Sequence, residues 1–239
     1  MYFEGIVYVL RTRCQWKALP AERYGSASAI HARFLEWEEA GLFEALWKLG
    51  LAEYDEFEGI AWRWQSIDGA MMKAPLAQES VGLNPADRGG NGSKRHLLVD
   101  SRGVPLSLVA AGVNRDDMSQ LESVLNAIVV ERANPPLRRH KHLCADAGYT
   151  GAPALRVIEE HGYIPHVKCR RQEAGELKRD LGRKARRWIV EVAHSWFNRF
   201  RKLLVRYEKL DRSFLALNHL AASIMALRKI RLEVNIIYG

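Results

Sequence analysis

The chain has 239 residues, of which 48% are hydrophobic and 27% are charged, as in an ordinary folded protein with its own core. This composition argues against a disordered chain, a fibrous repeat and a membrane protein. The longest apolar stretch, residues 214–227, is shorter than the roughly 20 residues of a membrane span. No signal peptide is expected, and three cysteines without paired spacing predict a cytoplasmic protein without a disulfide framework.

The positive charge of the chain is concentrated in one segment. Residues 168–212 hold 15 Lys and Arg against six Asp and Glu, whereas the rest of the chain holds 21 against 22. Such a concentration is typical of proteins that bind a polyanion, because neutralised phosphates release their counterions. A solvated basic surface is the simpler alternative.

The first 60 residues are predicted to be helical, since apolar side chains recur at helical spacing between residues 28 and 49. They carry six basic and ten acidic residues, an unfavourable balance for a region that binds DNA by itself. We therefore expect a helical N-terminal region, residues 1–60, that packs on the core or on another subunit.

From residue 61 the pattern changes to strands and helices in alternation, with a glycine-rich loop over 82–94. Strands are predicted over 62–70, 95–100, 104–110, 142–146 and 163–167, and helices over 117–132, 151–162, 184–209 and 213–231. A hairpin followed by such alternation favours an α/β fold with a mixed sheet flanked by helices, as in ribonuclease-H-like cores. This core is predicted to span residues 61–231 and to be followed by a tail, 232–239.

Three carboxylates stand out. Asp68 lies inside an apolar strand, where a charge is costly unless it is paired or bound to a cation; an outward-facing or turn-forming Asp is the alternative. Asp146 follows a buried strand, at the edge where open α/β sheets bind ligands, and could equally be a helix N-cap. Glu191 is the only acid between residues 181 and 207, and a surface ion pair with Arg187 would also explain it.

Together these acids predict a site for hard cations. Carboxylate oxygens suit Mg²⁺ or Mn²⁺, and two such ions can activate a nucleophile and stabilise the leaving oxygen of a phosphodiester. The neighbouring acids Asp100, Asp116 and Asp117 are interpreted as turn-forming and helix-capping residues instead. The sequence shows no nucleotide-binding glycine loop, so no nucleotide cofactor is expected.

The chain resembles a known family, the bacterial insertion-sequence transposases of the IS-five family. Their Asp-Asp-Glu (DDE) catalytic domain has a ribonuclease-H-like fold. The resemblance runs from about residue 5 to residue 230. It rests on these stretches: Leu10-Arg11-Thr12, Arg23-Tyr24-Gly25, Ser66-Ile67-Asp68-Gly69, Gly92-Ser93-Lys94-Arg95-His96, Gly103-Val104-Pro105-Leu106, Ala145-Asp146-Ala147-Gly148-Tyr149 and Arg187-Trp188-Ile189-Val190-Glu191.

The resemblance implies that Asp68, Asp146 and Glu191 are the catalytic, metal-binding triad. It also implies cleavage at the ends of an insertion sequence, dependent on two Mg²⁺ or Mn²⁺ ions, and transfer of the freed 3′-hydroxyl into target DNA. The partners expected are double-stranded DNA, both the terminal inverted repeats and the target, and further copies of the chain. The residues expected to contact DNA are Lys94, Arg95, Lys184, Arg187, Asn198, Arg199 and Lys202.

Two alternatives stay open from the sequence. Lys184 stands where the family has a tyrosine, and Asn198 where it has a Lys or Arg; the chain also begins close to its Leu-Arg-Thr stretch. These departures suggest a catalytically inactive or truncated DNA-binding remnant. A nuclease of the same fold, which hydrolyses DNA without strand transfer, is the other alternative.

Overall fold

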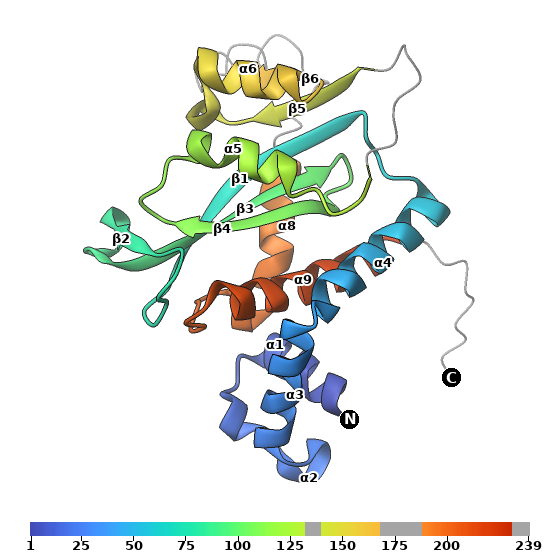
Figure 1. Cartoon of the computed structure of the whole chain (residues 1–239), viewed down its shortest axis with the longest axis vertical. Helices are drawn as coiled ribbons and strands as arrows, with labels where there is room; N and C mark the ends of the chain where they lie inside the picture. The colour runs from blue at the N-terminus through green and yellow to red at the C-terminus, as the bar shows by residue number, and fades with distance from the viewer. Residues whose placement is uncertain (132–139, 168–187, 231–239) are drawn as a thin grey trace.

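The computed structural model describes residues 1–131, 140–167 and 188–230 (Figure 1). Its N-terminal part is helical, as predicted. The elements are α1 (Tyr2–Thr12), a short 3-10 helix η1 (Trp16–Ala18), α2 (Ala21–Tyr24), α3 (Ala27–Glu39) and α4 (Leu42–Glu58). The Ser26 hydroxyl caps α3 by accepting a hydrogen bond from the Ala29 N–H, a common way to begin a helix.

A six-stranded mixed sheet forms the centre of the molecule. Its strands are β1 (Trp64–Lys73), β2 (Gly82–Asn84), β3 (Gly90–Asp100), β4 (Pro105–Gly112), β5 (Lys141–Ala145) and β6 (Tyr163–Val167). β3 lies antiparallel to β1, β2 and β4, whereas β5 is parallel to β1 and to β6. The long strands thus stand in the order β4-β3-β1-β5-β6, the arrangement of the ribonuclease-H-like core that was predicted.

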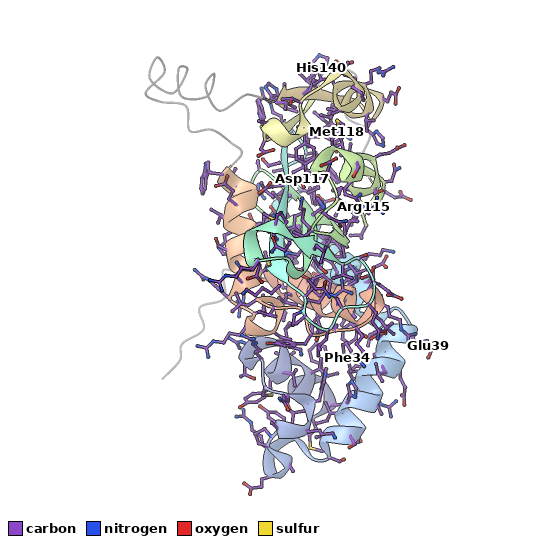
Figure 2. All side chains as sticks on the ribbon, turned by 90° about the vertical axis from the view of Figure 1, so that its left-hand side faces the viewer. Phe34, Glu39, Arg115, Asp117, Met118 and His140 are labelled. Carbon is purple, nitrogen blue, oxygen red and sulfur yellow. The ribbon has the colours of Figure 1, made fainter. Side chains whose placement is uncertain are left out.

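Helices cover both faces of this sheet. Their bounds are α5 (Asp117–Asn126), η3 (Ala147–Tyr149), α6 (Ala152–Glu160), α8 (Trp188–Asn198), η4 (Arg201–Leu203) and α9 (Asp211–Leu227), while η2 (Pro85–Asp87) follows β2. In Figure 2, α8 lies on one side of the sheet and α5 on the other. One buried cluster joins the first face to α8, α9 and the N-terminal helices, and a second joins the other face to α5 and α6.

Two sequence predictions are corrected here. The predicted loop at 82–94 contains β2 and the first part of β3, which extend the sheet as a hairpin arm. The predicted helix 184–209 ends at Asn198 in its described part. It ends there because the following residues bury Phe200 and Leu203 in a tight turn and then pair Val205 with Lys73 beside β1.

The N-terminal helices share the core of the sheet rather than standing apart from it. Trp47 of α4 is fully buried, and its indole N–H donates to the Pro105 carbonyl of β4 at 3.2 Å. Its ring stacks on His219 of α9 with 5.2 Å between the centroids. Asp100, interpreted from the sequence as a turn former, accepts hydrogen bonds from the backbone N–H groups of Arg102 and Val104. It also accepts one from the Tyr54 hydroxyl of α4.

His219 makes the stability of this junction sensitive to pH. Burial lowers the pKa of His219 from 6.5 to about 4, so the folded chain holds this imidazole neutral where the unfolded chain protonates it. Stability is therefore lost as pH falls below about 6.5, by up to about 2 kcal/mol between pH 7.5 and pH 5. We expect His219→Phe, measured by urea unfolding at both pH values, to lose less stability over this range than the wild type, by that amount. An equal loss in both proteins would contradict this assignment.

None of the described helices is long and apolar enough to cross a membrane. The described cysteines, Cys14 and Cys144, are free thiols. The predicted tail, 232–239, lies outside the described residues.

Candidate active site

Asp68 lies in the middle of β1, next to β3 and to the parallel strand β5. Its register partner Leu97 belongs to the cluster on the α8 side of the sheet, so the Asp68 carboxylate shares that face. Burial, together with the negative charges of Asp146, Asp117 and Glu191, raises the pKa of Asp68 to about 6, although a hydrogen bond from the Gly69 backbone opposes the shift. Asp68 is thus a half-buried acid under repulsion from three other carboxylates.

Asp146 follows β5 directly, at the carboxyl end of that strand. Ser66 and Cys144 are paired across β1 and β5, so Asp68 and Asp146 each stand two residues beyond a matched pair. The Asp146 Oδ1 atom accepts a hydrogen bond from the Gly148 N–H at 2.6 Å. It therefore caps η3, as one of the two interpretations of the sequence has it, while its charge also acts on Asp68.

Glu191 belongs to the first turn of α8. The helix packs on β1 and β3 through Val190, Ala193 and Phe197, which leaves Glu191 exposed at the rim of the sheet. Trp188, the first described residue of this helix, is 45% exposed, so the packed side of the helix does not include it. Even so, the Glu191 charge contributes to the raised pKa of Asp68.

The three predicted acids therefore come from β1, from the end of β5 and from α8, and their charges interact. Carboxylate oxygens alone make a donor set that suits Mg²⁺ or Mn²⁺. Within residues 1–131, 140–167 and 188–230, no three Asp, Glu, His or Cys side chains already form a closed metal-binding group. The mutual repulsion at Asp68 is the feature of this structure that a divalent cation would relieve.

A cavity of about 670 Å³ lies at the start of α5, and Asp68, Asp146 and Glu191 do not line it. It lies between the β2 arm, the start of α5 and the segment that follows β5. Figure 2 labels Arg115, Asp117 and Met118, which line it at the start of α5. Lys94 and Gly148 line it as well, so the cavity reaches the residues next to Asp146.

Asp117 is a functional candidate that the sequence analysis missed. It was interpreted with Asp116 as a helix cap, and α5 does begin at Asp117. Its carboxylate, however, forms an ion pair with Lys94 at 2.8 Å and raises the pKa values of Asp68 and Tyr149. The only sequence signal was its place between two strand-forming segments, which does not distinguish a cap from a site residue.

The predicted DNA-binding residues have different placements. Arg95 is 1% exposed and lies over the Phe197 ring, with Asn218 and His194 as hydrogen-bond partners. Burial lowers its pKa to about 9. A guanidinium packed in this way does not reach a phosphate, so the DNA-binding interpretation of Arg95 is withdrawn.

Two other residues that were predicted to bind DNA form ion pairs within the protein instead. Lys94 pairs with Asp117, and Lys202 is 7% exposed and pairs with Glu208 at 2.9 Å. Asn198 and Arg199 are exposed at the end of α8. Lys184 and Arg187 lie outside the described residues.

Comparison with known proteins gives two family matches. Residues 143–228 match a model described as a transposase DDE domain, and residues 1–47 match one described as a putative transposase of the IS4/5 family. The first match includes Asp146 and Glu191.

Two curated relatives come from Burkholderia cepacia. The putative transposase for insertion sequence element IS402 is 37% identical over 131 residues, which are 54% of this chain and 60% of that protein. An uncharacterized 16.2 kDa protein of IS402 is 32% identical over 82 residues, 34% of this chain and 56% of that protein. The matches thus span about 60% or less of the relatives' own length.

Solved structures give only a distant likeness. The Mos1 mariner paired-end complex with Mn is 12% identical, with a TM-score of 0.32 over 84% of this chain and 77% of that chain. The Mos1 catalytic domain is 8% identical, with a TM-score of 0.34 over 78% and 90%. Two segments of the chain, 1–47 and 143–228, are thus similar to insertion-sequence transposases of the IS4/5 type and to their DDE domain, and the 37% identical relative is described as a putative transposase.

Proposed function

We propose that this chain is a DNA transposase that cuts DNA at the ends of an insertion sequence and joins the freed 3′-hydroxyl to target DNA. The observation that supports it most is that Asp68, a half-buried acid whose pKa burial raises, also interacts with the charges of Asp146 and Glu191. Carboxylates held together against their repulsion are costly for folding, and such sites are typical of functional centres. The similarity of residues 143–228 to a transposase DDE domain supports a metal-binding role for these carboxylates.

Asp68, Asp146 and Glu191 would hold the divalent cations, Mg²⁺ or Mn²⁺, and we propose two ions. The bound cations would supply Lewis-acid activation of the attacking and leaving oxygens of a phosphodiester. The protein contributes the fixed spacing of the carboxylates: β1 and β5 hold two of them by their pairing, and α8 brings the third by packing on β1 and β3.

Double-stranded DNA is the proposed partner, bound by a homo-oligomer. Arg199 and Asn198 are exposed at the end of the helix that carries Glu191, so both can reach a backbone beside the site. Lys184 and Arg187 are proposed to add to this contact. The basic segment 168–212 supplies the net positive charge that favours the polyanion.

Replacing Arg199 by glutamine tests this surface. If Arg199 contacts a phosphate, DNA binding weakens alike for all sequences, and the slope of log K against log salt falls by about 1. Fluorescence anisotropy at several salt concentrations measures both quantities. Arg156→Gln, an exposed arginine on α6, is the matched control, and an equal change in both variants would place the DNA elsewhere.

A strand-transfer assay tests the whole proposal. The protein is incubated with Mn²⁺, a duplex that ends in the insertion-sequence terminus, and a plasmid target. Joined products support the transposase. Cleavage without joining indicates a nuclease, and salt-dependent binding without cleavage indicates a DNA-binding remnant; either result overturns the proposal.

A further inference from the structure

We propose that Asp117 is a fourth carboxylate of the cation site, with Lys94 as its built-in counter-ion and His96 packed behind it. This inference rests on the proposed function of the same site and assigns residues on the opposite face of the sheet from Glu191. Gly69 pairs with His96 across β1 and β3, next to the pair of Asp68 with Leu97. Side chains of neighbouring pairs point to opposite faces, so Asp117 approaches Asp68 from the α5 side.

The Lys94–Asp117 pair is held from several directions. The Lys94 Nζ atom lies 2.8 Å from Asp117 Oδ1 and donates to the Arg115 carbonyl at 3.1 Å. The lysine side chain is 9% exposed and that of Asp117 is 27% exposed. A lysine so buried is fixed in place, whereas the aspartate keeps access to solvent and to the cavity beside it.

Glycines make room for Asp117 at both predicted ligands. A Cβ atom on Gly69 would lie 2.9 Å from Asp117 Oδ1 and 2.9 Å from the His96 Nδ1 atom, so only glycine fits there without movement. A Cβ atom on Gly148 would lie 3.5 Å from Asp117 Oδ2 and 2.9 Å from Asp146 Oδ1. One oxygen of Asp117 thus faces the residue after Asp68, and the other faces the segment that holds Asp146.

His96 is the independent sign that a ligand belongs here. Its side chain is fully buried, and neither ring nitrogen has a hydrogen-bond partner among the described residues. The Nδ1 atom lies 3.8 Å from Asp117 Oδ1, so the ring faces the carboxylate without a hydrogen bond to it. An imidazole carries at least one N–H donor in either protonation state. A buried donor without an acceptor is costly, and a small shift of Asp117, or a water on a bound cation, would satisfy it.

The charges around Asp117 predict opposite effects for two substitutions. The negative charges of Asp117, Asp146 and Glu191 all act on Asp68, whereas Lys94 and His96 are the groups next to Asp117 itself. The four acids carry four formal negative charges, which Lys94 reduces to three. If Asp117 faces a cation, removing its charge weakens cation binding, whereas removing Lys94 strengthens it. If the Lys94–Asp117 pair lies away from the cation, neither substitution changes its affinity much, because solvent and salt screen a distant charge.

Titration calorimetry with Mn²⁺ as the probe, on the full chain without DNA, tests the assignment. We expect Asp117→Asn to raise the Kd for Mn²⁺ by about tenfold, and Lys94→Gln to lower it. Asp116→Asn, the exposed neighbour, is the matched control and should stay within about twofold of the wild type. Thermal melting of each metal-free variant checks that it folds, and Asp117→Ser replaces Asp117→Asn if that variant does not.

An unchanged Kd in Asp117→Asn, or a shift in the same direction for Lys94→Gln, would overturn the inference. Asp68→Asn separates this outcome from failure of the proposed function. If Asp68→Asn weakens Mn²⁺ binding and Asp117→Asn does not, the cation site stands and Asp117 is only structural. If Asp68→Asn binds Mn²⁺ like the wild type, both the proposed cation site and the fourth carboxylate are wrong.

Discussion

Replacing Asp68 by alanine is expected to lower the rate of metal-dependent DNA cleavage by about a thousandfold or more. Burial raises the pKa of Asp68, and the charges of Asp146, Asp117 and Glu191 raise it as well, so Asp68 interacts with each of these acids. Loss of a cation ligand removes stabilisation of the transition state, and a thousandfold corresponds to about 4 kcal/mol. Gel assays of an end-bearing duplex in Mn²⁺ measure the rate, and the same loss is expected for Asp146→Ala.

The cleavage defect should occur without loss of the fold. The charged form of Asp68 costs stability in the metal-free protein, as its raised pKa shows, so removing the charge does not weaken the core. DNA affinity and the melting temperature are therefore expected to change little. Asp116→Ala, an exposed acid near the site, is the control. A cleavage loss accompanied by unfolding, or equal losses in both variants, would contradict the assignment of Asp68.

The second large effect concerns the junction of the N-terminal helices with the sheet. Trp47→Ala should lower the free energy of unfolding by about 4 kcal/mol, because it leaves a large cavity and removes the hydrogen bond to Pro105. Since α4 packs on α9 and the two regions share one buried cluster, we expect one cooperative transition for the whole chain. Urea unfolding followed by circular dichroism and tryptophan fluorescence measures both quantities.

Leu49→Ala is the matched control for Trp47. Leu49 lies on the same helix and is 64% exposed, so its truncation should change stability by less than about 0.5 kcal/mol. Two separate transitions in the wild type would contradict the shared core and would favour an independent N-terminal domain. An effect of Leu49→Ala as large as that of Trp47→Ala would indicate that the exposed side of α4 around Leu49 packs against a partner.

Most strands of the sheet are marked in the sequence, but β2 is not, because it lies in a glycine-rich stretch that is typical of a loop. The hairpin β3–β4 is marked by its turn, in which Asp100 accepts hydrogen bonds from the N–H groups of Arg102 and Val104. β5 and β6 are short strands, with Gly148 soon after β5 and Gly162 directly before β6. Local patterns of this kind survive folding, and they fix which strands pair as neighbours.

Features that depend on packing across the sheet could not be read in the same way. Arg95 looks like a surface cation in the sequence, but its strand position turns it toward Phe197 and Asn218. Asp117 looks like a helix cap, and only the antiparallel pairing of Gly69 with His96 brings it beside Asp68. The end of α8 is likewise set by the pairing of Val205 with Lys73, a contact between residues far apart in the chain.

The most direct test of the central claim is the cleavage of a duplex that carries the insertion-sequence ends, with Mn²⁺ or with EDTA, by the wild type and by Glu191→Ala. Glu191 is the exposed acid that α8 brings to Asp68 and Asp146. Cutting that requires both the metal and Glu191 is the result that we predict. Cutting in EDTA, or cutting by Glu191→Ala at the wild-type rate, would contradict the three-carboxylate site.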